Sequence, residues 1–203
     1  MEKIKVIFLD IDGVLQPYDS KGRFEYRDKY GLESLQKKLT DELGRDYFQY
    51  DEYDVAACYC DWNKDAVNRI KRILDETGAK IVISSDWRNK KLPNKMKDFL
   101  KIWNMEEYWL ADNCYYYNSL AENAKEFQKE IDYVNMRKQE LNRCYFDSRS
   151  VEILHYVNMN NNIINYVAID DRNLCELPEG HFVKTYDFIT EDEANKVIEL
   201  LNK

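Results

Sequence analysis

Short apolar runs alternate along this chain with segments whose apolar residues recur at helical spacing. The apolar runs are rich in β-branched and aromatic residues, which is typical of strands buried in a sheet. Between them, residues 62–77 place Ala66, Ile70 and Leu74 on one face of a helix. Strands are predicted over about residues 3–10, 80–84, 109–117, 165–170 and 181–186, and further helices from residue 92, after residue 149 and from residue 190. This alternation predicts an α/β protein with a three-layer α/β/α, Rossmann-like core and a parallel sheet.

Two carboxylates follow the first apolar run, in the order Asp10, Ile11, Asp12, Gly13. Because side chains alternate along a strand, Asp10 and Asp12 are expected on the same side. Ligands of open α/β sheets bind beyond the carboxyl ends of the strands. Paired acids there can hold a hard cation, and one can attack phosphorus while the other moves a proton. A strand end with two solvated aspartates is the alternative interpretation.

Two later strands also end in polar residues. Ser84 and Ser85 follow the second run, and Asp170 and Asp171 close the fourth. Taken alone, the serine pair is typical of a helix cap or turn, and adjacent aspartates are common in turns. Three strands that all end in groups suited to catalysis indicate one site at a shared edge of the sheet.

The run FLDIDGVL resembles motif I of the haloacid dehalogenase (HAD) superfamily, in which Mg2+-dependent phosphatases acting through an aspartyl-phosphate predominate. The second and fourth runs are similar to motifs II and IV. This resemblance implies that Asp10 is the nucleophile and that Asp12 is the general acid and base. It also implies that the hydroxyl of Ser84, or that of its neighbour Ser85, donates a hydrogen bond to the phosphoryl group.

The same resemblance implies a Mg2+ site at these strand ends. Asp10, Asp170 and the backbone carbonyl of Asp12 would bind the ion, together with waters and a substrate phosphate. Strand alternation predicts that Asp171 points away from Asp170, so that it acts on the metal through water or by supporting another ligand.

HAD proteins supply a cation, usually Lys and sometimes Arg, from the start of the helix that precedes motif IV. Here Arg149 occupies that place, with Asp147 or Ser148 as the helix N-cap. Its charge would offset repulsion between Asp10 and a phosphate. An ordinary surface arginine near a helix start is the alternative.

The run SSDWR at residues 84–88, together with the later motifs and a final capping-box helix, resembles the HAD domain of Swiss Army Knife RNA repair proteins. Trp87 and Arg88 are then expected beside the site, where Arg88 could bind a second phosphate or the leaving group. Packing for Trp87 and a surface ion pair for Arg88 are the alternatives.

Two segments exceed what this core needs, and both lie where HAD proteins insert caps. We expect a single domain over residues 1–203 with inserts at residues 16–60 and 118–146. The first is rich in tyrosine, whose rings could stack on a base but are mostly expected to pack the insert. The pattern of the second predicts an amphipathic helix or helical hairpin, and we expect it to pack back on the sheet; a dimerising coiled coil is the alternative. Its apolar positions are Leu120, Ala124, Phe127, Ile131, Val134, Leu141 and Tyr145.

Composition narrows the class of protein. The chain has 203 residues and a formal net charge of -8, which disfavours extended nucleic-acid binding. Five cysteines without CxxC spacing argue against a zinc site or a disulfide framework. We see no signal peptide or membrane span, so reduced thiols and a cytoplasmic location are expected.

These observations predict a Mg2+-dependent phosphomonoester hydrolase. Its substrate is either a nucleotide or nucleic-acid terminal phosphate, as the resemblance suggests, or a small phosphomonoester, as the acidic charge suggests. A non-catalytic phosphate-binding or scaffold protein on a HAD fold is the alternative from another class, and a phosphotransferase is a third. Retention of both Asp10 and Asp12 argues against mere binding, which does not need the second acid.

Overall fold

The computed structural model describes residues 2–113, 115, 117 and 122–203 and contains one parallel sheet of five strands in the order β3-β2-β1-β4-β5. The strands are β1 (Ile4–Leu9), β2 (Lys80–Ile83), β3 (Trp109–Asp112), β4 (Ile163–Asp170) and β5 (Phe182–Lys184). The predicted α/β class and parallel sheet are therefore confirmed.

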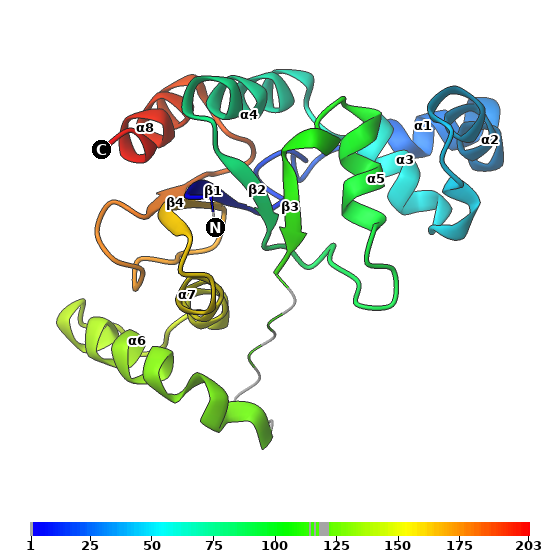
Figure 1. The fold of residues 1–203 in the computed structure, drawn as a ribbon. Coiled ribbons are helices and arrows are strands. Elements are labelled where there is room, and N and C mark those ends of the chain that lie inside the picture. Colours follow the sequence, from blue (N-terminus) through cyan, green and yellow to red (C-terminus); the bar gives the residue numbers. More distant parts are fainter. Residues whose placement is uncertain (1, 114, 116, 118–121) are drawn as a thin grey trace.

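Helices cover both faces of the sheet (Figure 1). One face carries α4 (Lys64–Thr77) and α8 (Glu191–Leu201), and the other carries α7 (Ser148–Met159) with α6 (Gln128–Glu140) outside it. Side chains of β1 alternate between two cores: Ile7 and Leu9 face one, and Val6 and Phe8 face the other. This burial on both faces fixes the strand ends that carry the polar residues.

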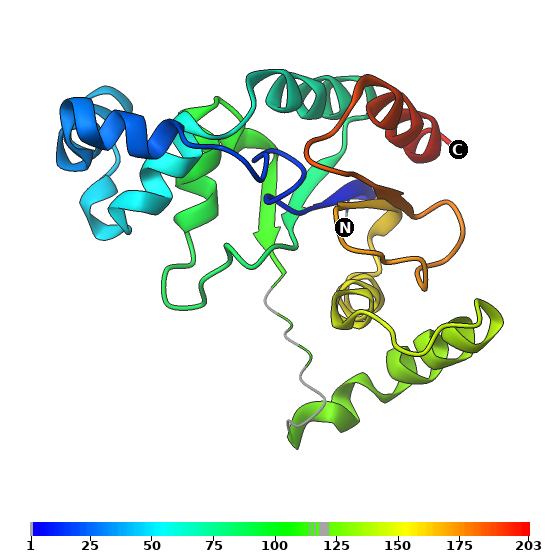
Figure 2. The same cartoon turned by 180° about the vertical axis from the view of Figure 1, so that it is seen from behind.

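The first predicted insert forms a group of helices beside the sheet. It contains α1 (Gly22–Tyr30), α2 (Leu32–Leu43) and α3 (Glu52–Cys60), which lie next to α5 (Lys95–Ile102), beyond the β3 edge (Figures 1 and 2). Its tyrosines differ in burial: Tyr47 and Tyr50 are buried, whereas Tyr18, Tyr30 and Tyr53 are exposed.

The second predicted insert departs from its expected pattern. Phe127 and Val134 are buried against α7, so α6 packs on a helix rather than on the sheet itself. Leu141 and Tyr145 are exposed because α6 ends at Glu140, and Asn142 then takes a positive φ of 52°. Leu120 lies outside the described residues, as do residues 114 and 116 of the predicted third strand, which ends at Asp112.

No helix in the described parts of the chain combines the length and apolar character that a membrane crossing requires.

Candidate active site

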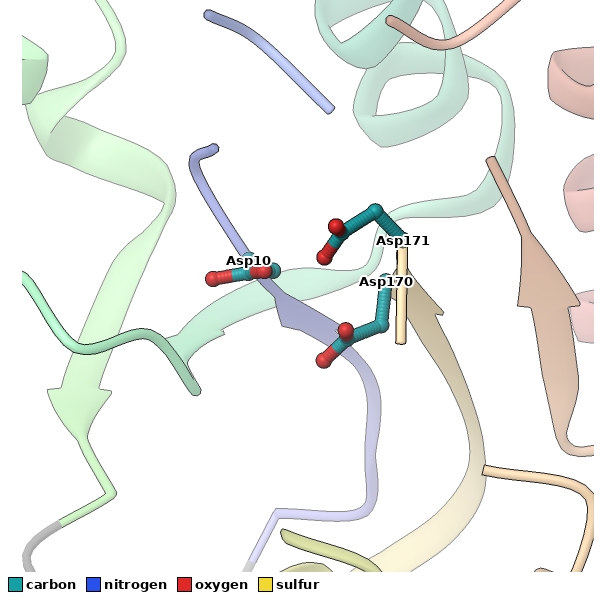
Figure 3. A group of neighbouring side chains, drawn as sticks. All are labelled: Asp10, Asp170 and Asp171. Atoms are coloured by element: carbon teal, nitrogen blue, oxygen red, sulfur yellow. The ribbon is translucent and has the colours of Figure 1, made fainter. Parts of the chain in front are cut away.

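The carboxyl ends of β1 and β4 bring three aspartates together (Figure 3). Leu9 pairs with Ile169 in the parallel ladder, and the Asp10 amide donates to the Ile169 carbonyl at 3.1 Å. Carboxylate oxygens of Asp10, Asp170 and Asp171 all lie within 4.8 Å of one another. Such a set of hard oxygen donors suits a divalent cation such as Mg2+.

The prediction that Asp171 points away from Asp170 is wrong. Strand β4 ends at Asp170, and the chain bends there while the Asp170 carboxylate accepts a hydrogen bond from the Arg172 amide at 2.8 Å. Side-chain alternation holds only while the backbone stays extended, so Asp171 turns back to the cluster. The hydroxyl of Tyr18 donates a hydrogen bond to Asp171 from the loop after β1.

Arg149 lies between the two buried aspartates. Its Nη1 is 2.8 Å from Asp170 Oδ2 and 3.0 Å from Asp10 Oδ2, and its side chain is 3% exposed. Asp147 caps α7 by accepting from the Arg149 amide, which fixes the arginine at the helix start. Burial disfavours the charged form of Arg149 and acts to lower its pKa. The negative charges of Asp170 and Asp10 outweigh this effect, so the pKa of Arg149 is raised overall. Arg149 is therefore not a surface arginine, and it offsets the negative charge of the cluster.

Asp10 is almost fully buried, and burial raises its pKa to about 7 against the opposing charge of Arg149. The two serines after β2 differ in their contacts. Ser85 hydrogen-bonds the Asp10 carboxylate through its side chain. The buried hydroxyl of Ser84, by contrast, has no hydrogen-bond partner among the described residues.

Both oxygens of the Asp12 carboxylate accept hydrogen bonds. Trp87 Nε1 donates to Oδ2 at 2.9 Å, and Gln16 Nε2 donates to Oδ1 at 3.1 Å. Burial raises the pKa of Asp12, while the Trp87 hydrogen bond and nearby Arg23 lower it. The sequence predicted that Trp87 lies beside the site, but we did not predict the contacts of Gln16 and Tyr18. The signal that could have pointed to these two residues is that both lie within eight positions of Asp10.

Arg88 lies in the loop that follows β2 and is buried. It donates to the carbonyls of Ser85 at 2.5 Å and Asn113 at 2.7 Å, and it pairs with Glu152 of α7 at 3.3 Å. These contacts link the ends of β2 and β3 to α7. Contact of Arg88 or Ser85 with substrate stays a prediction.

We expect Gly13→Ala to destabilise the protein and disturb the site. Gly13 has φ +71°, and an added Cβ would lie 2.6 Å from both Asp171 Cβ and the Tyr18 hydroxyl. Gly44 also has a positive φ, of +64°, but a Cβ there would meet nothing within 4 Å. In urea unfolding, Gly44→Ala should therefore report backbone strain alone, about 1 kcal/mol, and Gly13→Ala should cost a further ~1–3 kcal/mol by overpacking. Equal costs would show that Asp171 and Tyr18 yield easily.

Comparison with known proteins agrees with this geometry. Residues 6–191 match the family described as the HAD domain in Swiss Army Knife RNA repair proteins. Neither a curated protein nor a solved structure gives a significant match to the chain. The matched range includes every site residue described above, from Asp10 to Arg172. The chain therefore belongs to the HAD domains of Swiss Army Knife RNA repair proteins, a membership that implies hydrolase-type activity on phosphate esters.

Proposed function

We propose that this protein is a Mg2+-dependent phosphomonoester hydrolase that acts through an aspartyl-phosphate on Asp10. The observation that carries the proposal is the meeting of Asp10, Asp170 and Asp171 at one edge of the sheet, with the buried Arg149 between Asp10 and Asp170. A nucleophilic carboxylate needs nearby positive charge to accept a phosphate dianion, and this cluster offers both a cation and a set of metal ligands.

The donor set fits Mg2+, because among the described residues it consists of carboxylate oxygens from three aspartates, without a sulfur or imidazole ligand. Asp10, Asp170 and Asp171 would hold the ion, and the family resemblance adds the backbone carbonyl of Asp12. Bound there, Mg2+ would neutralise the phosphate and align it for in-line attack.

The chain's own residues supply the remaining steps. An Asp10 oxygen attacks phosphorus, the bond from phosphorus to the ester oxygen breaks, and Asp12 gives its proton to that leaving oxygen. Asp12 then takes a proton from water, which attacks the aspartyl-phosphate and regenerates Asp10 with release of phosphate. Arg149, which lies beside Asp10, and the unpartnered hydroxyl of Ser84 would hold the transferred oxygens.

The family name points to a phosphorylated nucleic-acid end as the substrate. The formal charge of -8 suits a contact limited to a few nucleotides, or a nucleotide or other small phosphomonoester. A screen with Mg2+ over 5′- and 3′-phosphorylated oligonucleotides, nucleotides and sugar phosphates tests the proposal, with phosphate release as the measurement. Loss of all release in the Asp10→Asn protein is the required control.

Two alternatives give different results in the same screen. A phosphate-binding scaffold would bind these compounds without releasing phosphate, but the two hydrogen bonds that hold Asp12 favour a role in proton transfer over simple binding. A phosphotransferase would pass the phosphoryl group to an added alcohol faster than to water.

We expect EDTA to abolish activity, and Asp170→Ala to raise the Mg2+ concentration for half-maximal activity by about tenfold or more. Asp170 is 1% exposed, and its oxygens are fixed by Arg149 and by the Arg172 amide. Asp171→Ala should have a smaller effect, because Asp171 is less buried and is already engaged by Tyr18. Magnesium titrations of the two variants beside Asp41→Ala, an exposed aspartate of α2 whose side chain is 65% exposed, measure the difference. A larger effect at Asp171 would reverse the assignment of the main ligand.

A further inference from the structure

Trp87 connects the proposed general acid to a part of the molecule outside the motifs. Its indole N–H donates to Asp12 Oδ2 at 2.9 Å across 75 positions of sequence, and Gln16 holds the other oxygen from the same turn as Asp12. Each carboxylate oxygen can accept two hydrogen bonds, so these two donors leave an acceptor position on each oxygen for the proton that Asp12 must carry.

The Trp87 ring is itself held in place from two sides. Its centroid lies 6.1 Å from that of Trp62, after α3, and 6.1 Å from that of Phe99 in α5, both edge-on. Lys95 Nζ lies 5.6 Å from the ring centroid and pairs at 2.7 Å with Asp54 of α3. The orientation of the Asp12 carboxylate therefore depends on packing between α5 and the first insert.

We propose that Trp87 is a positioning residue for proton transfer by Asp12: its N–H fixes the carboxylate in the orientation that delivers the proton to the leaving oxygen. This inference rests on the proposed hydrolase function and assigns Trp87 no contact with the phosphate. A carboxylate that turns about its terminal torsion has a broad range of orientations, since such torsions are soft. Two N–H donors on different segments remove that freedom before substrate binds.

The test uses two esters of nearly the same shape, p-nitrophenyl phosphate and phenyl phosphate. Phenolate is a much poorer leaving group than p-nitrophenolate, so its departure depends far more on a donated proton. Trp87→Phe keeps an aromatic ring between Trp62 and Phe99 but removes the N–H. We expect its kcat for phenyl phosphate to fall about tenfold, a part of the 10²–10⁴-fold that general acid catalysis typically contributes. Its kcat for p-nitrophenyl phosphate should change less than about twofold, and KM for both esters should stay within about twofold.

Trp62→Phe is the matched control, because its buried indole N–H has no partner among the described residues. It removes the same group from the adjacent ring and should leave the kcat ratio of the two esters unchanged. Asp12→Asn removes the proposed general acid itself and should give the largest change in the kcat ratio, with a greater fall of kcat on phenyl phosphate than on p-nitrophenyl phosphate. Gln16→Met removes the donor on the other oxygen and should change the ratio in the same direction as Trp87→Phe, which keeps the test usable if the Trp87 variant fails to melt cooperatively.

A uniform fall of kcat on both esters, or a change confined to KM, would show that Trp87 serves packing alone and would overturn the inference. An unchanged ratio in Trp87→Phe with a changed ratio in Asp12→Asn would do the same while leaving the hydrolase proposal intact. Turnover that persists in Asp10→Asn, or wild-type protein that releases phosphate from neither ester, would instead overturn the proposed function and this inference with it.

Discussion

Asp10→Asn is expected to lower phosphate release by about 10⁴-fold or more while the protein stays folded. The amide has the shape of the carboxylate but lacks the charge that attacks phosphorus. Folding should survive because Arg149 keeps its 2.8 Å contact with Asp170 after the change. Initial rates on p-nitrophenyl phosphate with Mg2+, together with a thermal melt, measure both parts of the prediction.

A direct measurement of the intermediate separates this mechanism from attack by water alone. Wild-type protein quenched in acid during turnover should gain the mass of one phosphoryl group on the peptide that contains Asp10, and Asp10→Asn should gain none. Asp41→Asn, an exposed change in α2, is the control and should keep both the rate and the labelled peptide. Residual hydrolysis near the wild-type rate in a folded Asp10→Asn protein would remove Asp10 from the nucleophilic role.

The sheet and the meeting of Asp10 with Asp170 could be predicted because both depend on short-range pattern. Apolar runs give the strands, and parallel strands bring their carboxyl ends to one edge, so the residues after Leu9 and at the end of β4 must be neighbours. Arg149 became a candidate through the resemblance to HAD proteins, which supply a cation from the start of this helix. Of the two predicted N-caps, Asp147 is the one that caps the helix.

The contacts that orient the acids could not be predicted in this way. The side chains of Tyr18 and Asp171 meet across 153 positions, and those of Trp87 and Asp12 across 75, through loops that carry no periodic pattern. The direction of Asp171 depends on a bend that begins one residue earlier, which shifts every later side chain. The predicted burial of Leu141 and Tyr145 is wrong for the same reason: α6 ends at Glu140, and the backbone then takes a positive φ at Asn142.

Arg149→Met should cause the largest loss of stability among single changes at the site, about 3–5 kcal/mol in urea unfolding with EDTA present. Methionine keeps much of the side-chain volume but leaves Asp10 and Asp170 buried without the cation that lies 3.0 and 2.8 Å from them. Activity should fall with stability, because the phosphate would meet two uncompensated carboxylates. Arg172→Ala is the matched control: Arg172 pairs with Asp147 at 2.7 Å but is 38% exposed, so its removal should cost at most about 1 kcal/mol.

The stability lost in Arg149→Met should also increase with pH. Burial already raises the pKa of Asp10 to about 7, and removal of Arg149 takes away the main influence that lowers it. Carboxyls whose pKa is higher in the folded protein than in the unfolded chain weaken folding as pH rises above the unfolded value, near 4. The difference in unfolding free energy between wild type and Arg149→Met should therefore be greater at pH 8 than at pH 5, and Asp10→Asn combined with Arg149→Met should recover part of it. A difference that is the same at both pH values would mean that Arg149 stabilises the fold through packing rather than by compensating the two buried acids.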